Sequence, residues 1–290
     1  MHLDGKKLAH EIHHEIRDKV QSLEGPAPKL VAVLVGEDPA SQLYVRNKMR
    51  ACEKVGIRSE RRLLPASLTE SQLLVEIDFL NKDPEVTGIL VQLPLPKQID
   101  PLKVAQAIDP MKDVDGVHPI NFGKLLMGDV NALVPCTPLG IQTLLMRSGI
   151  DVMGQHVVIA GRSNIVGKPL AALLMQRREG GNATVTVVHQ HSKAVGEIAK
   201  NADILVAAIG KPHFFTQEMV KPGAVVIDVG QNRLEDSQRP SGYRLVGDVH
   251  YHEVKDQVQA ITPVPGGVGP MTIAMLLQNT VSAYDLQNRL

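Results

Sequence analysis

Short runs of apolar and β-branched residues recur along the chain and alternate with segments of helical periodicity. The strand-like segments are residues 29–35 (KLVAVLV), 88–93 (GILVQL), 156–160 (HVVIA), 183–189, 203–209 and 224–229. Continuous apolar runs of this kind predict parallel strands that are buried on both faces. Because helix-like segments separate them, the pattern predicts an α/β protein.

Helices are predicted where apolar residues recur every three or four positions. The first long one begins at Asp38-Pro39, ends before Gly56, and is expected to bury Leu43 on its apolar face. Further helices are predicted over residues 69–81, 101–108, 139–148, 168–178, 194–201 and 271–284. Residues 109–137 are rich in Gly, Pro and Asp and are predicted to be a long loop, a type of segment that is often functional.

The strands and helices fall into two series, which predicts two α/β lobes with a ligand cleft between them. A chain of 290 residues is long enough for two ordinary domains. We expect one domain from residues 1–138 together with 271–290, and a second, Rossmann-like domain from residues 139–270.

Composition excludes several classes of protein. The 31 Lys and Arg residues balance the 31 Asp and Glu residues, which argues against a nucleic-acid or membrane-surface protein. The two cysteines form neither a disulfide framework nor a CxxC knuckle, as is typical of a reducing compartment. The first residues contain no long apolar stretch, and no segment resembles a spanning helix. The sequence therefore predicts a soluble, cytoplasmic protein.

A glycine-rich turn follows the strand at 156–160. Gly161 permits a tight turn, and Gly167 permits close packing of the next helix, whose N-terminus attracts phosphate. The turn departs from the usual GxGxxG pattern because Ser163 replaces the middle glycine. It is therefore either a dinucleotide-binding turn or an ordinary glycine-rich connection.

The next predicted strand ends at residues 189–193 (HQHSK), without the carboxylate that usually binds the ribose of NAD. A 2′-phosphate needs charge-assisted hydrogen-bond donors, and Arg162, Ser192 and Lys193 could supply them. We therefore predict NADP rather than NAD as the cofactor. The alternative is that these side chains are solvated loop residues.

Candidate reactive residues also occur in the first lobe. Tyr44 and Lys48 lie four positions apart and share one face of a predicted helix. A lysine acts as a base only where burial or a nearby cation lowers its pKa. Gln92 interrupts an apolar strand at its carboxyl end, where open α/β sheets bind ligands. The alternatives are a surface lysine beside a core tyrosine, and a glutamine satisfied by loop backbone.

Some acidic and histidine residues are candidate metal ligands. Asp113 and Asp115 lie on the predicted loop, but no further ligands follow at a suitable spacing. The histidines at 10, 13 and 14 are expected on a solvated helix face. We predict no metal site and assign Asp115 to hydrogen bonding with a ligand. Residues 262–270 (TPVPGGVGP) form either a ligand-approaching loop or a simple turn.

Several motifs together resemble the bifunctional methylenetetrahydrofolate dehydrogenase/cyclohydrolase family of folate one-carbon metabolism. They occur in family order across nearly the whole chain: 44–48 (YVRNK), 91–96 (VQLPLP), 112–116 (KDVDG), 161–169 (GRSNIVGKP), 228–230 (DVG) and 263–272 (PVPGGVGPMT). Two departures concern Gln231, where the family commonly has an apolar or small residue, and His250, where an acidic residue is usual.

The resemblance implies roles for particular residues. Asp115 would anchor the pterin, Tyr44 would pack beside it, and Lys48, tuned by Gln92, would serve the hydrolytic step. The folate site would also include Val91, Leu93, Pro265, Gly266 and Gly267. The implied NADP-binding residues are Gly161, Arg162, Ser163, Val166, Gly167, His191, Ser192 and Gln231.

The resemblance also implies an activity, in which NADP⁺ oxidises methylenetetrahydrofolate to the methenyl form and water then converts it to 10-formyltetrahydrofolate. It further implies a homodimer. Two alternatives are a dehydrogenase without the hydrolytic step and a non-catalytic NADP-binding regulator. The presence of both Lys48 and Gln92 argues against the first alternative, and intact residues at all the motifs argue against the second.

Overall fold

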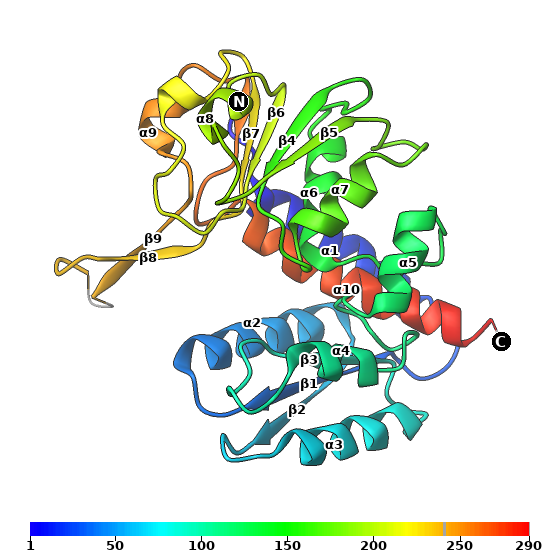
Figure 1. Cartoon of the computed structure of the whole chain (residues 1–290). Coiled ribbons are helices and arrows are strands. Elements are labelled where there is room, and N and C mark those ends of the chain that lie inside the picture. Colours follow the sequence, from blue (N-terminus) through cyan, green and yellow to red (C-terminus); the bar gives the residue numbers. More distant parts are fainter. Residues whose placement is uncertain (240–241, 290) are drawn as a thin grey trace. The chain divides into compact units, whose positions relative to one another are not determined.

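The computed structural model describes residues 1–239 and 242–289, and the chain divides into two compact units (Figure 1). Unit 1 consists of Met1–Ala9 and Thr137–Thr272, and unit 2 of His10–Cys136 and Ile273–Leu290. The predicted α/β class is confirmed, because helices alternate with strands and each unit contains a parallel sheet. The expected limits of the functional domains stay a prediction.

Unit 2 contains a three-stranded parallel sheet in the order β2-β1-β3. The predicted strands are β1 (Lys29–Val35), which lies in the centre, and β3 (Gly88–Val91) at one edge. The predicted helices are also present, as α2 (Pro39–Val55), α3 (Glu70–Lys82) and α4 (Pro101–Ala107). The expectation for Leu43 was wrong: its side chain is 47% exposed, while Val45 and Cys52 of the same helix are buried.

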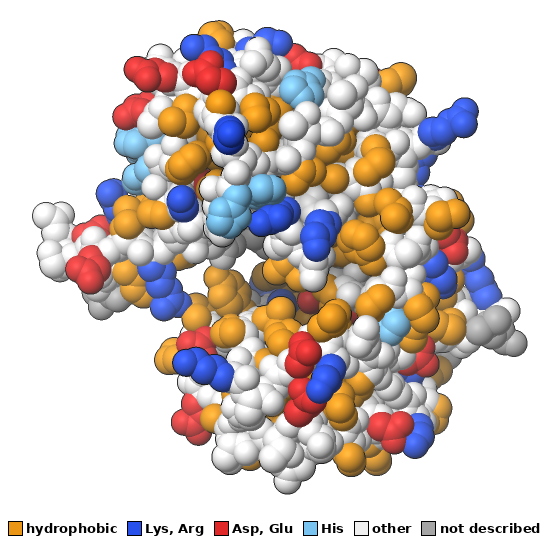
Figure 2. Space-filling model, viewed as in Figure 1, with side chains coloured by type: hydrophobic (Ala, Val, Ile, Leu, Met, Phe, Trp, Pro, Cys, Tyr) orange, Lys and Arg blue, Asp and Glu red, His pale blue; other side chains and the backbone are white. Residues whose placement is uncertain are grey.

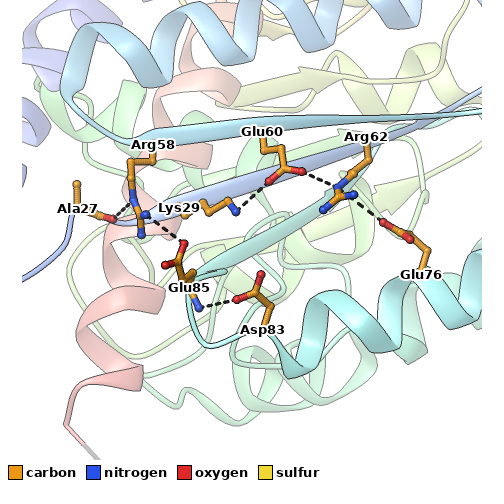
Figure 3. A network of polar contacts seen from close by, with 8 residues as sticks. All are labelled: Ala27, Lys29, Arg58, Glu60, Arg62, Glu76, Asp83 and Glu85. Atoms are coloured by element: carbon orange, nitrogen blue, oxygen red, sulfur yellow. Dashed lines mark hydrogen bonds and ion pairs between the residues drawn. The ribbon is translucent and has the colours of Figure 1, made fainter.

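Strand β2 (Arg58–Leu64) was not predicted, because its sequence RSERRLL is mostly charged. It lies at the sheet edge, where one side faces solvent and charged side chains are tolerated. Figure 3 shows how these charges are paired. Glu60 forms ion pairs with Lys29 of β1, at 2.9 Å, and with Arg62, at 2.6 Å. Paired charges therefore replace the apolar pattern from which strands are recognised.

Helix α5 (Pro119–Met127) interrupts the segment that was predicted to be one long loop, so that prediction was wrong in part. The His118 side chain caps the helix by accepting from the Ile120 amide at 3.0 Å, and Pro119 occupies the first turn. Because histidine is not among the usual N-cap residues, the sequence contains no recognisable sign that a helix begins here. Helix α6 (Cys136–Arg147) ends the segment.

The buried side chain of Lys112 ties the remaining loop to helix α3. Its Nζ donates to the carbonyl oxygens of Leu80, Asn81 and Asp83 at 3.2, 2.7 and 2.7 Å. These are carbonyls of the last turn of α3, which lack partners within the helix. Burial lowers the pKa of Lys112. This lysine therefore has a structural role within the 112–116 motif.

Unit 1 contains a five-stranded parallel sheet in the order β10-β7-β6-β4-β5. Its strands are β4 (His156–Ala160), β5 (Thr184–Val188), β6 (Ile204–Ala207), β7 (Val225–Asp228) and β10 (Ala260–Ile261). All but the short β10 were predicted. The chain order reverses at β4, with β5 on one side and β6 on the other. In open α/β sheets, such a switch point marks the ligand-binding edge.

Helices cover both faces of this sheet (Figure 1). Val158, Leu205 and Val226 point to a core that includes residues of α8 (Val195–Ala199) and α9 (Tyr251–Val254). Helices α6 and α7 (Gly167–Leu174) lie on the other side. Helix α7 is shorter than the predicted 168–178. The first residues of the chain complete unit 1, since the Leu3 amide donates to the Ile261 carbonyl at 2.9 Å.

The remaining elements are short or terminal. Strands β8 (Asn232–Glu235) and β9 (Tyr243–Val246) form an antiparallel hairpin, and residues 240–241 between them lie outside the described part of the chain. A 3-10 turn covers Gln217–Met219. The last helix, α10 (Val268–Gln287), extends beyond the predicted 271–284 at both ends.

The face of the molecule shown in Figure 2 has no dominant charge of one sign. Acidic and basic side chains are interspersed with apolar ones over the face shown in Figure 2, in agreement with the neutral composition. Within residues 1–239 and 242–289, no helix is both long and apolar enough to cross a bilayer.

Replacing Lys112 with methionine tests its structural role. Because the change leaves three buried carbonyls without a donor, we expect K112M to lower the free energy of unfolding by about 3 kcal/mol. Urea unfolding followed by circular dichroism measures the loss. The matched control is K103M, which removes an exposed lysine paired with Glu70 and should shift the midpoint far less. Equal shifts would contradict the role of Lys112.

Candidate active site

Lys48 and Gln92 meet at the carboxyl end of strand β3. Asp38 caps helix α2 by accepting from the Ser41 amide at 2.7 Å, which places Tyr44 and Lys48 on successive turns. The Lys48 Nζ donates to Gln92 Oε1 at 3.0 Å, and Gln92 Nε2 donates to the Leu93 carbonyl at 2.7 Å. Both ends of the Gln92 amide are therefore bonded, which fixes the side chain against the lysine.

Tyr44 is exposed and Lys48 is half-buried. The Tyr44 side chain is 41% exposed, so the alternative of a tyrosine packed in the core does not hold. Val91 is half-buried and Leu93 is exposed, next to Gln92 in the chain. The predicted residues of this lobe thus include accessible side chains around a fixed lysine–glutamine pair.

Asp113 and Asp115 have different environments although they are two residues apart. Asp113 is fully buried and accepts from the amides of Val117 and His118, at 3.1 and 2.8 Å, and from Asn121 Nδ2 at 2.9 Å. Burial raises the pKa of Asp113 to about 7, against the opposing effect of these hydrogen bonds. Asp115 is only half-buried. Of the two carboxylates, Asp115 is therefore the one available to a ligand.

Cys136 brings Asp115 and Lys48 into one neighbourhood. Burial, followed by the negative charge of Asp115, raises the pKa of the Cys136 thiol well above its ordinary value, while the positive charge of Lys48 acts in the opposite direction. The thiol donates to the carbonyl of Val114, the residue before Asp115, at 3.4 Å. The structure thus places Lys48 in direct contact with Gln92, and the charges of Lys48 and Asp115 both act on the buried Cys136 thiol.

No metal centre accompanies this group. Across the residues that the structure describes, no three His, Cys, Asp or Glu side chains are arranged to hold a metal ion. The His10 and His14 rings stack edge to face with their centroids 4.5 Å apart, on the exposed side of α1 (Gly5–Gln21). The observed chemistry is that of an amine, an amide and a carboxylate.

In unit 1, the glycine turn after β4 is packed too tightly for any side chain at its two ends. Gly161 has a φ of +142°, and a Cβ atom there would lie 2.3 Å from the Ala208 carbonyl oxygen. A Cβ atom on Gly167 would lie 2.0 Å from the Gly161 oxygen. Ser163 Oγ accepts from the Val166 amide at 3.1 Å inside the turn. The close packing predicted for Gly167 is confirmed, and the positive φ of Gly161 agrees with the tight turn predicted there.

The residues predicted to bind a 2′-phosphate follow two paired strands. Arg162 comes after β4 and is exposed, and Ser192 comes after β5. Ser192 Oγ accepts from the His189 amide at 3.0 Å, and the His191 amide donates to His189 Nδ1 at 3.2 Å. The end of β5 is thus an ordered turn without a carboxylate, next to the strand that carries the glycine turn.

Two buried carboxylates at the same sheet edge were not predicted. Asp248 Oδ2 accepts from the amides of Ile209 and Gly210, at 2.7 and 2.8 Å, and its Oδ1 accepts from Asn232 at 2.9 Å. Asp228 accepts from the Asp248 amide at 2.9 Å. These contacts fix the carboxyl ends of β6 and β7 and the start of the β8–β9 hairpin.

The same pair of aspartates positions its neighbours in the chain. Burial, together with the charge of Asp248, raises the pKa of Asp228 to about 7. A Cβ atom on Gly247 would lie 1.8 Å from Asp228 Oδ2, so the carboxylate rests directly on a glycine. Gln231, a predicted cofactor residue, is exposed and precedes Asn232. The sequence does carry one hint of this pair, because an Asp lies close to a Gly in both segments, at 228–230 (DVG) and at 247–248 (GD).

The glycine loop before α10 belongs to unit 1. Pro265 is exposed, and the Gly266 carbonyl accepts from the Lys6 amide at 3.0 Å. A Cβ atom on Gly5 would lie 1.9 Å from the Gly267 oxygen, so the first turn of α1 packs directly on this loop. Tyr44, Lys48, Val91, Gln92, Leu93 and Asp115 all belong to unit 2.

Two family models match the chain. Residues 3–115 match the catalytic domain of tetrahydrofolate dehydrogenase/cyclohydrolase, and residues 135–288 match its NAD(P)-binding domain. The chain is 51% identical over 290 residues to a protein of Protochlamydia amoebophila described as bifunctional protein FolD, covering 100% of this chain and 99% of that protein.

Solved structures agree. The Campylobacter jejuni bifunctional enzyme FolD, a methylenetetrahydrofolate dehydrogenase/cyclohydrolase, superposes with a TM-score of 0.93 at 47% identity, over 100% of this chain and 99% of its own. The Trypanosoma brucei enzyme, solved with NADP cofactor and inhibitor, gives a TM-score of 0.93 at 39% identity, with 99% and 98% covered. The chain belongs to the tetrahydrofolate dehydrogenase/cyclohydrolase family, and residues 135–288 are its NAD(P)-binding domain.

Proposed function

We propose that this protein oxidises 5,10-methylenetetrahydrofolate with NADP⁺ and then hydrolyses the methenyl product to 10-formyltetrahydrofolate. The observation that carries the proposal is the hydrogen bond from Lys48 to Gln92 with Asp115 close by. These residues occur in a chain whose two halves match the catalytic and NAD(P)-binding domains of such enzymes.

The first step needs binding and orientation more than acid or base chemistry. A hydride and its electron pair leave the methylene carbon for the nicotinamide ring, and the folate nitrogens stabilise the resulting cation. We assign to the half-buried Asp115 the donor edge of the pterin, since a carboxylate accepts strong hydrogen bonds from such groups. Tyr44, Val91 and Leu93 supply contact surface around it.

The second step requires movement of a proton. Water adds to the methenyl carbon and loses one proton, which gives a carbinolamine. The remaining hydroxyl proton is then transferred to N5 as the carbon–nitrogen bond to N5 breaks, which gives the formyl product. The Lys48 Nζ donates to Gln92 Oε1 at 3.0 Å, which fixes the position of the amine. We assign to this amine the transfer of the water proton. The same pair argues against an enzyme limited to hydride transfer.

The residues of unit 1 fit NADP. The turn from Gly161 to Gly167 forms a cradle that any Cβ atom would fill, and it opens at the start of α7, where backbone amides attract a pyrophosphate. Arg162 and Ser192 supply donors for the 2′-phosphate, with His191 and Gln231 beside the cofactor. When bound, NADP⁺ supplies the hydride acceptor, and the chain supplies its orientation.

We also propose that the protein is a cytoplasmic homodimer. The two cysteines are both free and buried, which suits a reducing compartment. The dimer rests on the family resemblance, and sedimentation equilibrium of the purified protein tests it.

A cofactor-resolved assay tests the proposed function directly. The purified chain receives methylenetetrahydrofolate with NADP⁺ or with NAD⁺, and the NADPH, methenyl and formyl products are followed together. We expect turnover that depends on NADP⁺ and continues to the formyl product. A folded chain that binds NADP without any turnover would favour a non-catalytic regulator instead.

Replacing Lys48 with methionine tests the hydrolytic step. Because the variant cannot accept the water proton, K48M should lose at least about 100-fold in cyclohydrolase kcat while retaining hydride transfer. The methenyl intermediate should therefore accumulate in a stopped-flow assay. The control, K54M, changes an exposed lysine of the same helix and should behave as wild type. Full hydrolysis by K48M would refute the assignment.

Replacing Arg162 with alanine tests the cofactor preference. Loss of one charge-assisted contact to the 2′-phosphate should raise the KM for NADP⁺ about tenfold and leave the KM for NAD⁺ within about twofold. Steady-state kinetics with each cofactor measure both values. R177A removes another exposed arginine of unit 1 and serves as the charge-matched control. An unchanged ratio of the two constants in R162A would contradict the NADP prediction.

A further inference from the structure

A buried polar layer lies beneath the turn that carries Asp115, and its central residue is Asn279 of helix α10. We propose that Asn279 is a positioning residue for Asp115, acting through the Val114 carbonyl and the Cys136 thiol. The inference rests on the proposed function, because it assigns to Asn279 an effect on folate binding.

Asn279 connects two segments that are far from it in sequence. Its Nδ2 donates to the Val114 carbonyl at 2.9 Å and to the Val134 carbonyl at 2.8 Å. The side chain is 3% exposed, so water does not compete for these bonds. Val114 directly precedes Asp115, and Val134 lies two residues before Cys136. One amide group therefore sets the spacing between the two segments.

Two residues of the 114–116 turn contact this layer. The Val114 carbonyl accepts from Asn279 Nδ2 at 2.9 Å and from the Cys136 thiol at 3.4 Å. A Cβ atom on Gly116 would lie 2.5 Å from both the Val134 carbonyl carbon and the Pro135 nitrogen, so the turn rests directly on this backbone. Movement of the layer would therefore move the Asp115 carboxylate.

Cys136 is a second buried donor to the carbonyl that precedes Asp115. Its thiol donates to the Val114 carbonyl at 3.4 Å, and the Asn279 Nδ2 lies 3.7 Å from Cys136 Sγ. Burial and the charge of Asp115 raise the pKa of Cys136, which keeps the thiol protonated and able to donate. The amide and the thiol therefore hold the same carbonyl, and through it the turn that carries Asp115.

The choice of asparagine follows from the two carbonyl acceptors. A leucine of similar size would leave both carbonyls unpaired, and an aspartate would place a further acceptor against them. The next residue, Thr280, differs in this respect. It is equally buried, but its hydroxyl donates at 2.8 Å to the Leu276 carbonyl of its own helix. Thr280 is therefore a matched control for losing a buried hydrogen bond on α10.

The experiment measures folate and cofactor constants separately in the full-length protein. We expect N279L to raise the KM for methylenetetrahydrofolate about tenfold, because small misplacements of a binding group are costly, with the KM for NADP⁺ within about twofold. T280V should alter neither constant. Circular dichroism and the NADP⁺ constant verify that each variant is folded.

A double-mutant cycle with D115N separates positioning from general loosening. If Asn279 acts through Asp115, N279L should have an effect of less than about twofold in the D115N background. An equal effect of N279L in both backgrounds, or parallel losses for folate and NADP⁺, would overturn the proposal.

Cys136 variants give a second test that does not depend on the folding of N279L. C136A should raise the folate KM about threefold, and C136S, which retains a donor, should restore it. C52A controls for truncation of a buried cysteine elsewhere in unit 2. Unchanged folate binding in C136A would overturn the link. A wild-type chain without turnover would instead remove the proposed function, and this inference with it.

Discussion

The polarity of the two parallel sheets determines where this chain can carry out chemistry. A parallel strand presents its carboxyl end at the same edge as its neighbours, so residues that follow different strands gather there. In unit 2, Gln92 follows β3, and Lys48 belongs to the helix that follows β1. In unit 1, the glycine turn follows β4, and Ser192 follows β5.

Much of the fold could be predicted from the sequence, because parallel strands buried on both faces consist of continuous apolar runs. Strands β1 and β4 match their predicted limits, and α2 begins and ends at its predicted cap residues. The elements that were not predicted are stabilised by interactions other than burial of apolar faces. Strand β2 carries charges that are paired across the sheet edge, and α5 begins at a histidine cap. In both cases tertiary contacts replace the local pattern.

Some residues of the candidate site could be predicted from the sequence and others could not. Lys48, Gln92 and Asp115 were recognisable from short motifs, and the structure places Lys48 in hydrogen-bond contact with Gln92. The residues that support them were not recognisable, since their partners are distant in sequence. Asn279 lies 165 residues from Val114, and the Asp228–Asp248 pair joins three separate loops. No local pattern of apolar or charged residues encodes such contacts.

The discontinuity of unit 2 has a consequence for the time course of synthesis. Asn279 is added 143 residues after Cys136, which at about 5–20 residues per second corresponds to a delay of about 7–30 s. During that interval the 114–116 turn and the Val134 segment exist without the amide that joins them. These contacts can therefore form only after α10 has been synthesised, later than those between the strands of the unit.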